Sequence, residues 1–215
     1  MKKNFNILIT NTSRSIIYLK IFKKNKIFPE RVIYLDNSIK NKISLKLKKI
    51  LKNKIYFKKI FKTNNINNKN VVKYLINLKH PYIVYSGYSG FIIKDKKLLK
   101  KKIIHSHTGR LPEYKGSTTI FYSLLKENKI YCSTLLLNKN IDSGKILLIK
   151  KYLLPKTILQ IDDKYDHEIR ARNIVSFFKS KKNFKIIKKY KTNKKLLPYY
   201  IMHPVLRYIT MHNRR

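Results

Sequence analysis

The chain has 215 residues, of which 43% are hydrophobic, and this is enough for one domain with a buried core. Its formal net charge of +41 makes it a strongly basic protein. Because it has a single cysteine (Cys132), an internal disulfide is excluded. No apolar run approaches the length of a membrane span, and the polar residues that follow the first apolar run are not typical of a signal peptide, so we expect a cytoplasmic protein.

The charge is distributed unevenly. Residues 1–80 contain 21 Lys and Arg against 2 acidic residues, whereas residues 113–168 contain 9 against 7. A basic protein of this kind can attract nucleic acid or an anionic lipid surface. Compositional drift in an AT-rich genome would also raise Lys, Asn and Ile together. The concentration of carboxylates in residues 113–168 indicates a function for that segment.

Alternating apolar runs and amphipathic segments predict strands and helices in turn. The expected strands are 4–10, 31–36, 55–61, 82–90, 101–107, 131–137 and 145–154, and the expected helices are 11–25, 38–53, 70–80, 117–128 and 161–180. This order is typical of an α/β fold with a doubly wound, mostly parallel sheet flanked by helices in a single domain. We predict a catalytic domain over residues 1–180 and a basic, apolar tail over 181–215 that docks on it.

Two histidines end the strand 101–107 and begin a stretch of unusual variety, HSHTGRLPEYKG. His105 and His107 share one face of a strand, at the carboxyl end where ligands bind in α/β sheets. With Asp142 they could form a metal site, but the nearest further ligands, Glu113 and Cys132, have no familiar spacing, and we predict no metal. A structural role for the histidines remains the alternative.

Asp142 lies in the turn NIDSGK between two apolar strands. A carboxylate beside an imidazole raises the imidazole pKa and fixes its orientation, as general acid–base chemistry requires. An ordinary Asx turn is the other interpretation.

Together, IIHSHTGRLPEYKG and NIDSGKILL resemble the folate-dependent formyltransferase family. That family has a strand ending in Asn-x-His, a proline-containing loop, and an Asp-x-Gly turn some 35 residues later. Here His107 and Asp142 are 35 positions apart. The resemblance implies a Rossmann-type fold and formyl transfer from N10-formyltetrahydrofolate to a primary amine.

Residue by residue, the resemblance implies that His107 and Asp142 are catalytic. His107 would donate toward the oxyanion, and Asp142 would orient His107 and relay the amine proton. His105 occupies the slot where the family has Asn, which is a departure. The implied pteridine pocket is lined by Gly90, Phe91, Ile92, Leu98, Asn140 and Ile141.

The acceptor amine is less well defined by the sequence. Ser13, Arg14 and Ser15 follow the first strand and could bind a phosphate at a helix N-terminus, although a plain helix cap is the alternative. Gly116 and Ser117 complete the expected acceptor site. We predict a small phosphorylated or nucleotide-linked amine, with no requirement for nucleic acid. The alternative function is a retired formyltransferase scaffold that binds RNA or an anionic membrane surface through its basic faces.

Overall fold

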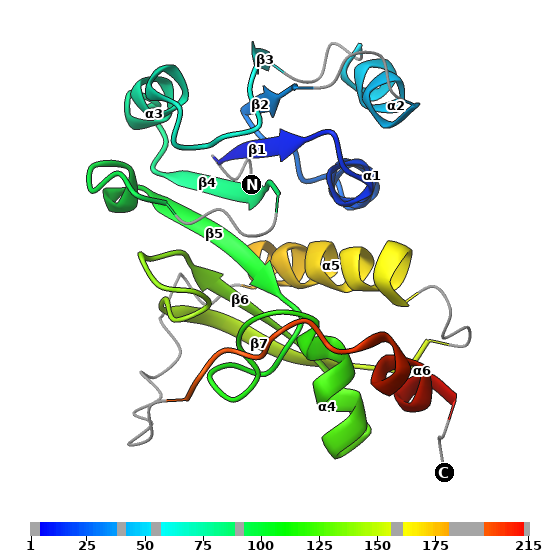
Figure 1. The fold of residues 1–215 in the computed structure, drawn as a ribbon. Helices are drawn as coiled ribbons and strands as arrows, with labels where there is room; N and C mark the ends of the chain where they lie inside the picture. Colours follow the sequence, from blue (N-terminus) through cyan, green and yellow to red (C-terminus); the bar gives the residue numbers. More distant parts are fainter. Residues whose placement is uncertain are drawn as a thin grey trace. The chain divides into compact units, whose positions relative to one another are not determined.

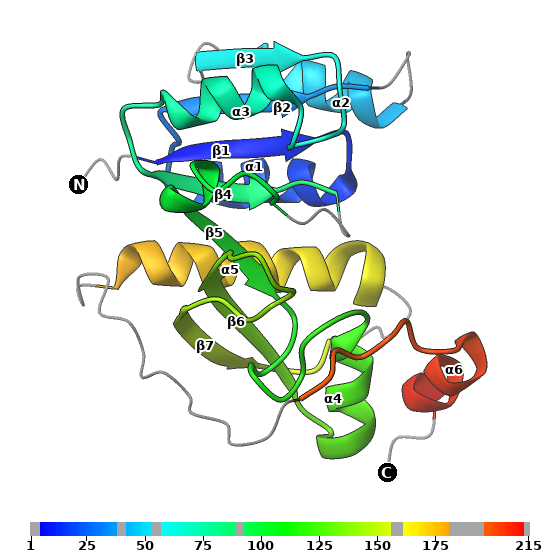
Figure 2. The ribbon, with the colours of Figure 1, turned by 60° about the vertical axis from the view of Figure 1, so that its left-hand side comes forward.

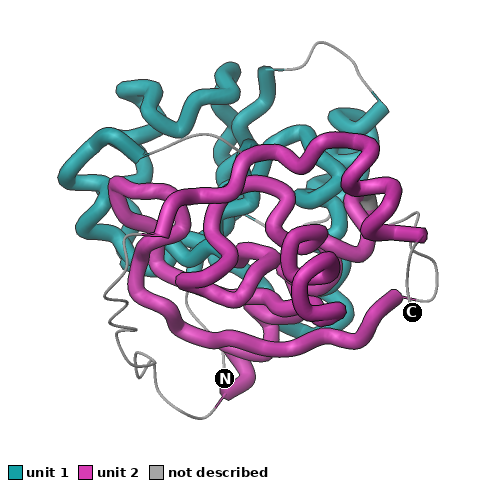
Figure 3. The backbone as a smooth tube through the Cα atoms, turned by 60° about the horizontal axis from the view of Figure 1, so that its bottom comes forward, with its two compact units in different colours: residues 1–105 teal, residues 106–215 magenta. Residues whose placement is uncertain are grey.

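The computed structural model describes residues 5–37, 42–52, 57–88, 93–155, 161–180 and 196–212, without the side chain of residue 163. The predicted pocket residues Gly90, Phe91 and Ile92 lie outside the described residues. Internal contacts divide the chain into two compact units, residues 1–105 and 106–215 (Figure 3). This division after residue 105 differs from the boundary predicted after residue 180, which separates the proposed catalytic domain from its tail and stays a prediction.

The described strands form a seven-stranded sheet in the order β3-β2-β1-β4-β5-β6-β7. The pairs β1–β2, β1–β4, β2–β3 and β4–β5 are parallel, whereas β6–β7 is antiparallel. The predicted fold class, a mostly parallel α/β sheet with helices, is confirmed.

Unit 1 contains the parallel strands and their crossover helices. All five residues of β1 are buried because helices cover both faces of the sheet in this unit. Helices α1 and α2 lie on one face and α3 lies on the other (Figures 1 and 2). The elements are β1 (Asn6–Thr10), α1 (Ser13–Lys24), β2 (Arg31–Leu35), α2 (Lys42–Leu51), β3 (Phe57–Phe61), α3 (Lys69–Ile76), β4 (Tyr82–Ser86), the 3-10 helix η1 (Leu98–Lys100) and most of β5 (Lys102–His107).

Unit 2 is built on an antiparallel pair of strands. Helices α4 and α5 both contact β6 and lie on opposite sides of the β6–β7 pair (Figure 1). The elements are the end of β5, α4 (Thr119–Glu127), β6 (Ile130–Leu136), β7 (Ile146–Tyr152), the π-helical turn η3 (Ile161–Tyr165), α5 (Asp166–Lys179) and α6 (Pro204–His212). A core cluster between these elements comprises Ile120, Phe121, Leu124, Ile130, Cys132, Ile161, Ile169 and Met202.

Two features of unit 2 differ from the predictions. The helix expected from residue 161 begins as the π-helical turn η3, and regular α-helix starts at Asp166. Helix α6 was not predicted as an element. It contacts α4, and Met202, two residues before α6, is buried in the core cluster. No helix within the described ranges is long and apolar enough to cross a membrane.

Candidate active site

The imidazole of His107 lies at the end of β5 and is almost fully buried, with 4% of its side chain exposed. Its Nε2 atom is 2.7 Å from the backbone oxygen of Tyr114 and 3.0 Å from Thr119 Oγ1. The Thr119 hydroxyl donates its hydrogen to the Thr108 oxygen over 2.6 Å, so it accepts from His107. Because a carbonyl also only accepts, Nε2 carries a proton.

The other ring nitrogen faces Asp142. His107 Nδ1 lies 3.4 Å from Asp142 Oδ2, and the carboxylate is largely enclosed, with 11% of its side chain exposed. Since Nε2 is already protonated, the proton that titrates in this pair lies between Nδ1 and the carboxylate. The predicted association of His107 with Asp142 is therefore present in the geometry.

Local backbone conformation places Asp142 in this position. Asp142 has φ 46°, which an Asp tolerates better than most residues, in the turn between β6 and β7. A Cβ on the neighbouring Gly144 would overlap the backbone oxygen of Leu136, so only glycine fits there. The Gly116 N–H donates to Asp142 Oδ2 over 3.0 Å. The turn and the loop around Gly116 together hold the carboxylate.

Burial sets the electrostatics of the pair. Desolvation lowers the pKa of His107 below its ordinary value of 6.5, and the negative charge of Asp142 opposes that effect. Arg170 lowers the pKa of His107 further. At neutral pH the result is a neutral imidazole beside a carboxylate, with the Nδ1 lone pair available to accept a proton.

A buried network behind the site was missed by the sequence analysis. Arg170 Nε donates to Asp166 Oδ2 over 2.7 Å, and its other nitrogens donate to Ser106 O and Thr108 Oγ1 over 2.6 and 2.8 Å. These bonds tie α5 to the end of β5 on either side of His107. The signal in the sequence was the spacing of Asp166 and Arg170, which are four residues apart and can pair on a helix. Acidic residues are scarce in this chain, with ten in all, so such a pair stands out.

His105 precedes the pair by two residues on β5 and is partly buried. Its ring centroid lies 6.0 Å from that of Tyr85 on the neighbouring strand β4. Burial raises the pKa of Tyr85 to about 12, so this phenol stays neutral at physiological pH. The structure thus gives His105 an aromatic neighbour, and its role in the Asn slot stays a prediction.

The predicted phosphate-binding residues lie at the N-terminus of α1. Thr12 is the N-cap, and Ser13 is exposed while Arg14 is partly buried. Ser15 is fully buried, and its hydroxyl donates to the Ser86 oxygen over 2.9 Å. Ser15 therefore has a structural bond between α1 and β4, and phosphate binding by these residues stays a prediction.

The remaining predicted residues are placed as follows. Leu98 is fully buried in η1, whereas Asn140 and Ile141 are exposed in the turn that carries Asp142. Gly116 bonds to Asp142, and the neighbouring Ser117 N–H donates to Tyr199 O over 2.8 Å. Of the predicted set, the structure brings together His107, Asp142 and Gly116.

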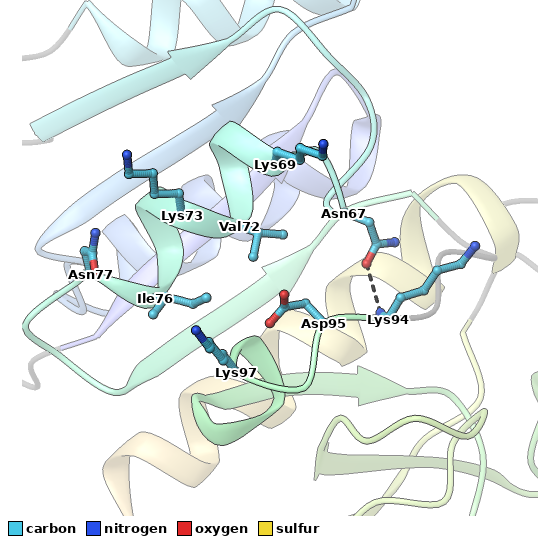
Figure 4. Close-up of a pocket in the computed structure, with 9 residues that line it drawn as sticks. All are labelled: Asn67, Lys69, Val72, Lys73, Ile76, Asn77, Lys94, Asp95 and Lys97. Atoms are coloured by element: carbon cyan, nitrogen blue, oxygen red, sulfur yellow. Dashed lines mark hydrogen bonds between the residues drawn. The ribbon is translucent and has the colours of Figure 1, made fainter.

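A separate hollow of about 610 Å³ lies in unit 1 (Figure 4). It is lined by Val72 and Ile76 together with the lysines 69, 73, 94 and 97. Its lining includes none of the predicted site residues. Within the described ranges, no group of three or more His, Cys, Asp or Glu side chains could hold a metal ion, and the absence of a metal stays a prediction.

Comparisons with known proteins found relatives in sequence and in fold. A methionyl-tRNA formyltransferase from Finegoldia magna is 36% identical over 98 residues, which covers 44% of this chain and 31% of that relative. No protein-family model matches the chain. A phosphoribosylglycinamide formyltransferase structure from Bacillus halodurans aligns with a TM-score of 0.59 at 13% identity, covering 83% of this chain and 96% of the other.

A sugar N-formyltransferase structure from Shewanella sp aligns with a TM-score of 0.58 at 14% identity, covering 98% of this chain and 87% of the other. At these identities the structural likeness establishes the fold, which is that of formyltransferases. In sequence the chain is similar to a methionyl-tRNA formyltransferase over 98 residues. Its match spans about a third of the Finegoldia magna formyltransferase.

Within the formyltransferase fold, the site can hold and move one proton. His107 is fixed by two acceptors at Nε2, and its Nδ1, which carries no proton in the neutral imidazole, faces Asp142 Oδ2 at 3.4 Å. The sequence could not indicate Tyr114 because it contributes its backbone oxygen, which any residue has. Thr119 was missed because a threonine at a helix start is also an ordinary structural residue.

Proposed function

We propose that this chain transfers the formyl group of N10-formyltetrahydrofolate to a primary amine. The observation that carries the proposal is the 3.4 Å approach of His107 Nδ1 to Asp142 Oδ2 in a formyltransferase fold. A buried, neutral imidazole backed by a carboxylate is a suitable general base near neutral pH.

In the proposed reaction, the amine nitrogen attacks the formyl carbon and a tetrahedral intermediate forms. The amine loses a proton to the His107–Asp142 pair. The bond between the formyl carbon and N10 then breaks, and a proton passes to N10. His107 can donate to the oxyanion only from Nδ1, because the Nε2 proton is held by Tyr114 O and Thr119 Oγ1. In this mechanism His105 supplies a second donor in place of the family's Asn.

The acceptor we propose is a small phosphorylated or nucleotide-linked amine. Structural neighbours include a phosphoribosylglycinamide formyltransferase and a sugar N-formyltransferase, both named for small acceptors. The exposed Ser13 and the basic Arg14 at the start of α1 support a phosphate contact.

Methionyl-tRNA is a second candidate acceptor. The observation that favours it is the 36% identity to a methionyl-tRNA formyltransferase over 98 residues. The net charge of +41 also suits a polyanionic acceptor.

The test is a transfer assay with the purified chain and N10-formyltetrahydrofolate labelled in the formyl group. The acceptors are glycinamide ribonucleotide, a nucleotide-linked amino sugar and methionyl-tRNA. We expect label in one acceptor, at a rate that falls in Asp142→Asn and is retained in Asp95→Asn, a control carboxylate whose Oδ1 accepts from the Leu98 N–H. Absence of transfer to all three, with no binding of a non-transferable formyl-folate analogue, would overturn the proposal.

In that outcome the retired scaffold becomes the better hypothesis. Binding to RNA or to vesicles of anionic lipid would then be measured directly. Affinity for RNA that falls steeply as salt rises would support a phosphate-contacting surface.

A further inference from the structure

A segment near the C-terminus lies against the loop that carries Gly116. Tyr199 forms an isolated parallel bridge with Gly116. The Ser117 N–H donates to the Tyr199 oxygen over 2.8 Å, and the Tyr199 N–H donates to the Lys115 oxygen over 2.8 Å. The backbone of this segment is therefore joined to the loop by one parallel bridge.

The same loop contacts both members of the candidate catalytic pair. The Tyr114 oxygen accepts from His107 Nε2 over 2.7 Å, and the Gly116 N–H donates to Asp142 Oδ2 over 3.0 Å. The loop thus lies between the C-terminal segment and the pair, and its conformation sets the positions of both side chains.

Side chains fix the C-terminal segment on the loop. The Tyr199 ring stacks on Tyr114 at a centroid distance of 5.9 Å and packs on Tyr122 at 4.3 Å. The Met202 N–H donates to Thr118 Oγ1 over 2.8 Å, and the Met202 side chain is buried in the core cluster. These contacts anchor the segment at the bridge residue Tyr199 and three residues after it, at Met202.

The loop conformation is coupled to the bridge through Gly116. Gly116 has φ +105°, which other residues rarely adopt, and a Cβ there would lie 2.7 Å from the Tyr199 nitrogen. The close approach of the two backbones and the unusual dihedral angle therefore occur together.

We propose that residues 199–202 position the His107–Asp142 pair, with Tyr199 as the positioning residue. The segment acts through the loop, since Gly116 connects the Tyr199 bridge to the Asp142 carboxylate. The catalytic consequence rests on the proposed formyl transfer, whereas the structural coupling does not.

The coupling is tested by amide hydrogen exchange on the full chain labelled with ¹⁵N. In Tyr199→Ala we expect the Gly116 and Ser117 amides to exchange about tenfold faster, while the β6 amides keep their protection. Tyr199→Phe keeps the ring and should match the wild type, as should Tyr208→Ala, which removes an exposed tyrosine from α6. Unchanged protection of Gly116 in Tyr199→Ala would overturn the proposal.

A second variant keeps the test decisive if Tyr199→Ala does not fold. Thr118→Ala removes the acceptor of the Met202 N–H and leaves the tyrosine stack intact. We expect the same faster exchange at Gly116 and Ser117. Wild-type exchange rates at these two amides in a folded Thr118→Ala protein would refute the coupling.

The catalytic consequence is tested separately by kinetics. With an active acceptor, Tyr199→Ala should lower kcat about tenfold and change KM less than about threefold, because the pair is misplaced while substrate contacts remain. An unchanged kcat beside faster Gly116 exchange would show that the pair's position is not limiting. If the wild type transfers no formyl group, the proposed function fails, and the exchange result still decides the coupling.

Discussion

His107 and Asp142, 35 residues apart in sequence, approach to 3.4 Å between Nδ1 and Oδ2. The contact connects the end of β5 to the turn between β6 and β7. Each partner has a second restraint, since Tyr114 O holds the imidazole and the Gly116 N–H holds the carboxylate. Both side chains of the pair are thus held in place by backbone groups.

Replacing Asp142 by Asn tests the carboxylate. Asn keeps the shape but removes the charge, so we expect kcat to fall by about 10²- to 10⁴-fold. The pKa of His107 should be lower in this variant than in the wild type, because the charge of Asp142 raises that pKa in the wild type. Kinetics and NMR titration of the labelled imidazole measure the two effects. A pKa of His107 that rises in Asp142→Asn would contradict the electrostatic account, and Asp95→Asn is the matched control.

The buried imidazole also predicts a pH dependence of stability. The folded protein binds a proton at His107 less readily than the unfolded chain, since burial lowers its pKa below 6.5. The contribution of His107 to the free energy of unfolding is therefore fully present above pH 6.5 and declines below it, by at most about 1.4 kcal/mol per pH unit. Urea denaturation from pH 7.5 to 5 measures this. His107→Gln should show a shallower decline, and an equal slope in the two proteins would argue against the prediction.

Arg170 is expected to contribute more to stability than its neighbour Arg172. Arg170→Lys loses the planar fork that reaches Asp166, Ser106 O and Thr108, at a cost of about 2–3 kcal/mol. Arg172→Lys is the control on the same helix, because its pair with Glu168 has the same spacing but the arginine is 57% exposed. That change should cost about 0.5 kcal/mol or less. Similar denaturation midpoints for both variants would show that the buried network is not stabilising.

His105 is tested by two substitutions. His105→Asn restores the family's amide, so we expect kcat/KM to stay within about threefold of wild type or to rise. His105→Leu removes the donor and should lower kcat by about 10²- to 10³-fold. Steady-state assays with the acceptor that the transfer assay identifies decide this. Equal activity of the Leu variant and wild type would assign His105 a structural role beside Tyr85.

Much of the fold could be predicted from the sequence, because strands and helices here follow regular apolar patterns. The buried run of β1 and the amphipathic pattern of α3 are examples. Helix α6 could not, since Val205, Ile209 and Thr210 are poor helix formers. Its stability comes from tertiary contacts, including Arg207 over the Phe121 ring at 4.5 Å and an ion pair of Arg207 with Asp162.

The candidate site was predictable where side chains carry it. His107 and Asp142 were found from their residue types and their spacing. Tyr114 and Gly116 contribute backbone atoms. Backbone atoms leave no signature in the sequence, so only the presence of a glycine at position 116 could have drawn attention to this loop. Ser15 was predicted as a ligand contact from its position after a strand; its hydroxyl bonds to Ser86, and the ligand contact stays a prediction.

Glycine is scarce in this chain, with five in 215 residues. At Gly109 a Cβ would lie 2.5 Å from the Tyr114 oxygen and 2.9 Å from His107 Nε2. At Gly116 and Gly144 it would meet the backbone of Tyr199 and of Leu136. In a library of random substitutions, these three codons should tolerate replacement least, whatever drives the rest of the sequence toward lysine and asparagine. The same three positions would be the first to trace in distant relatives when the remaining sequence no longer aligns.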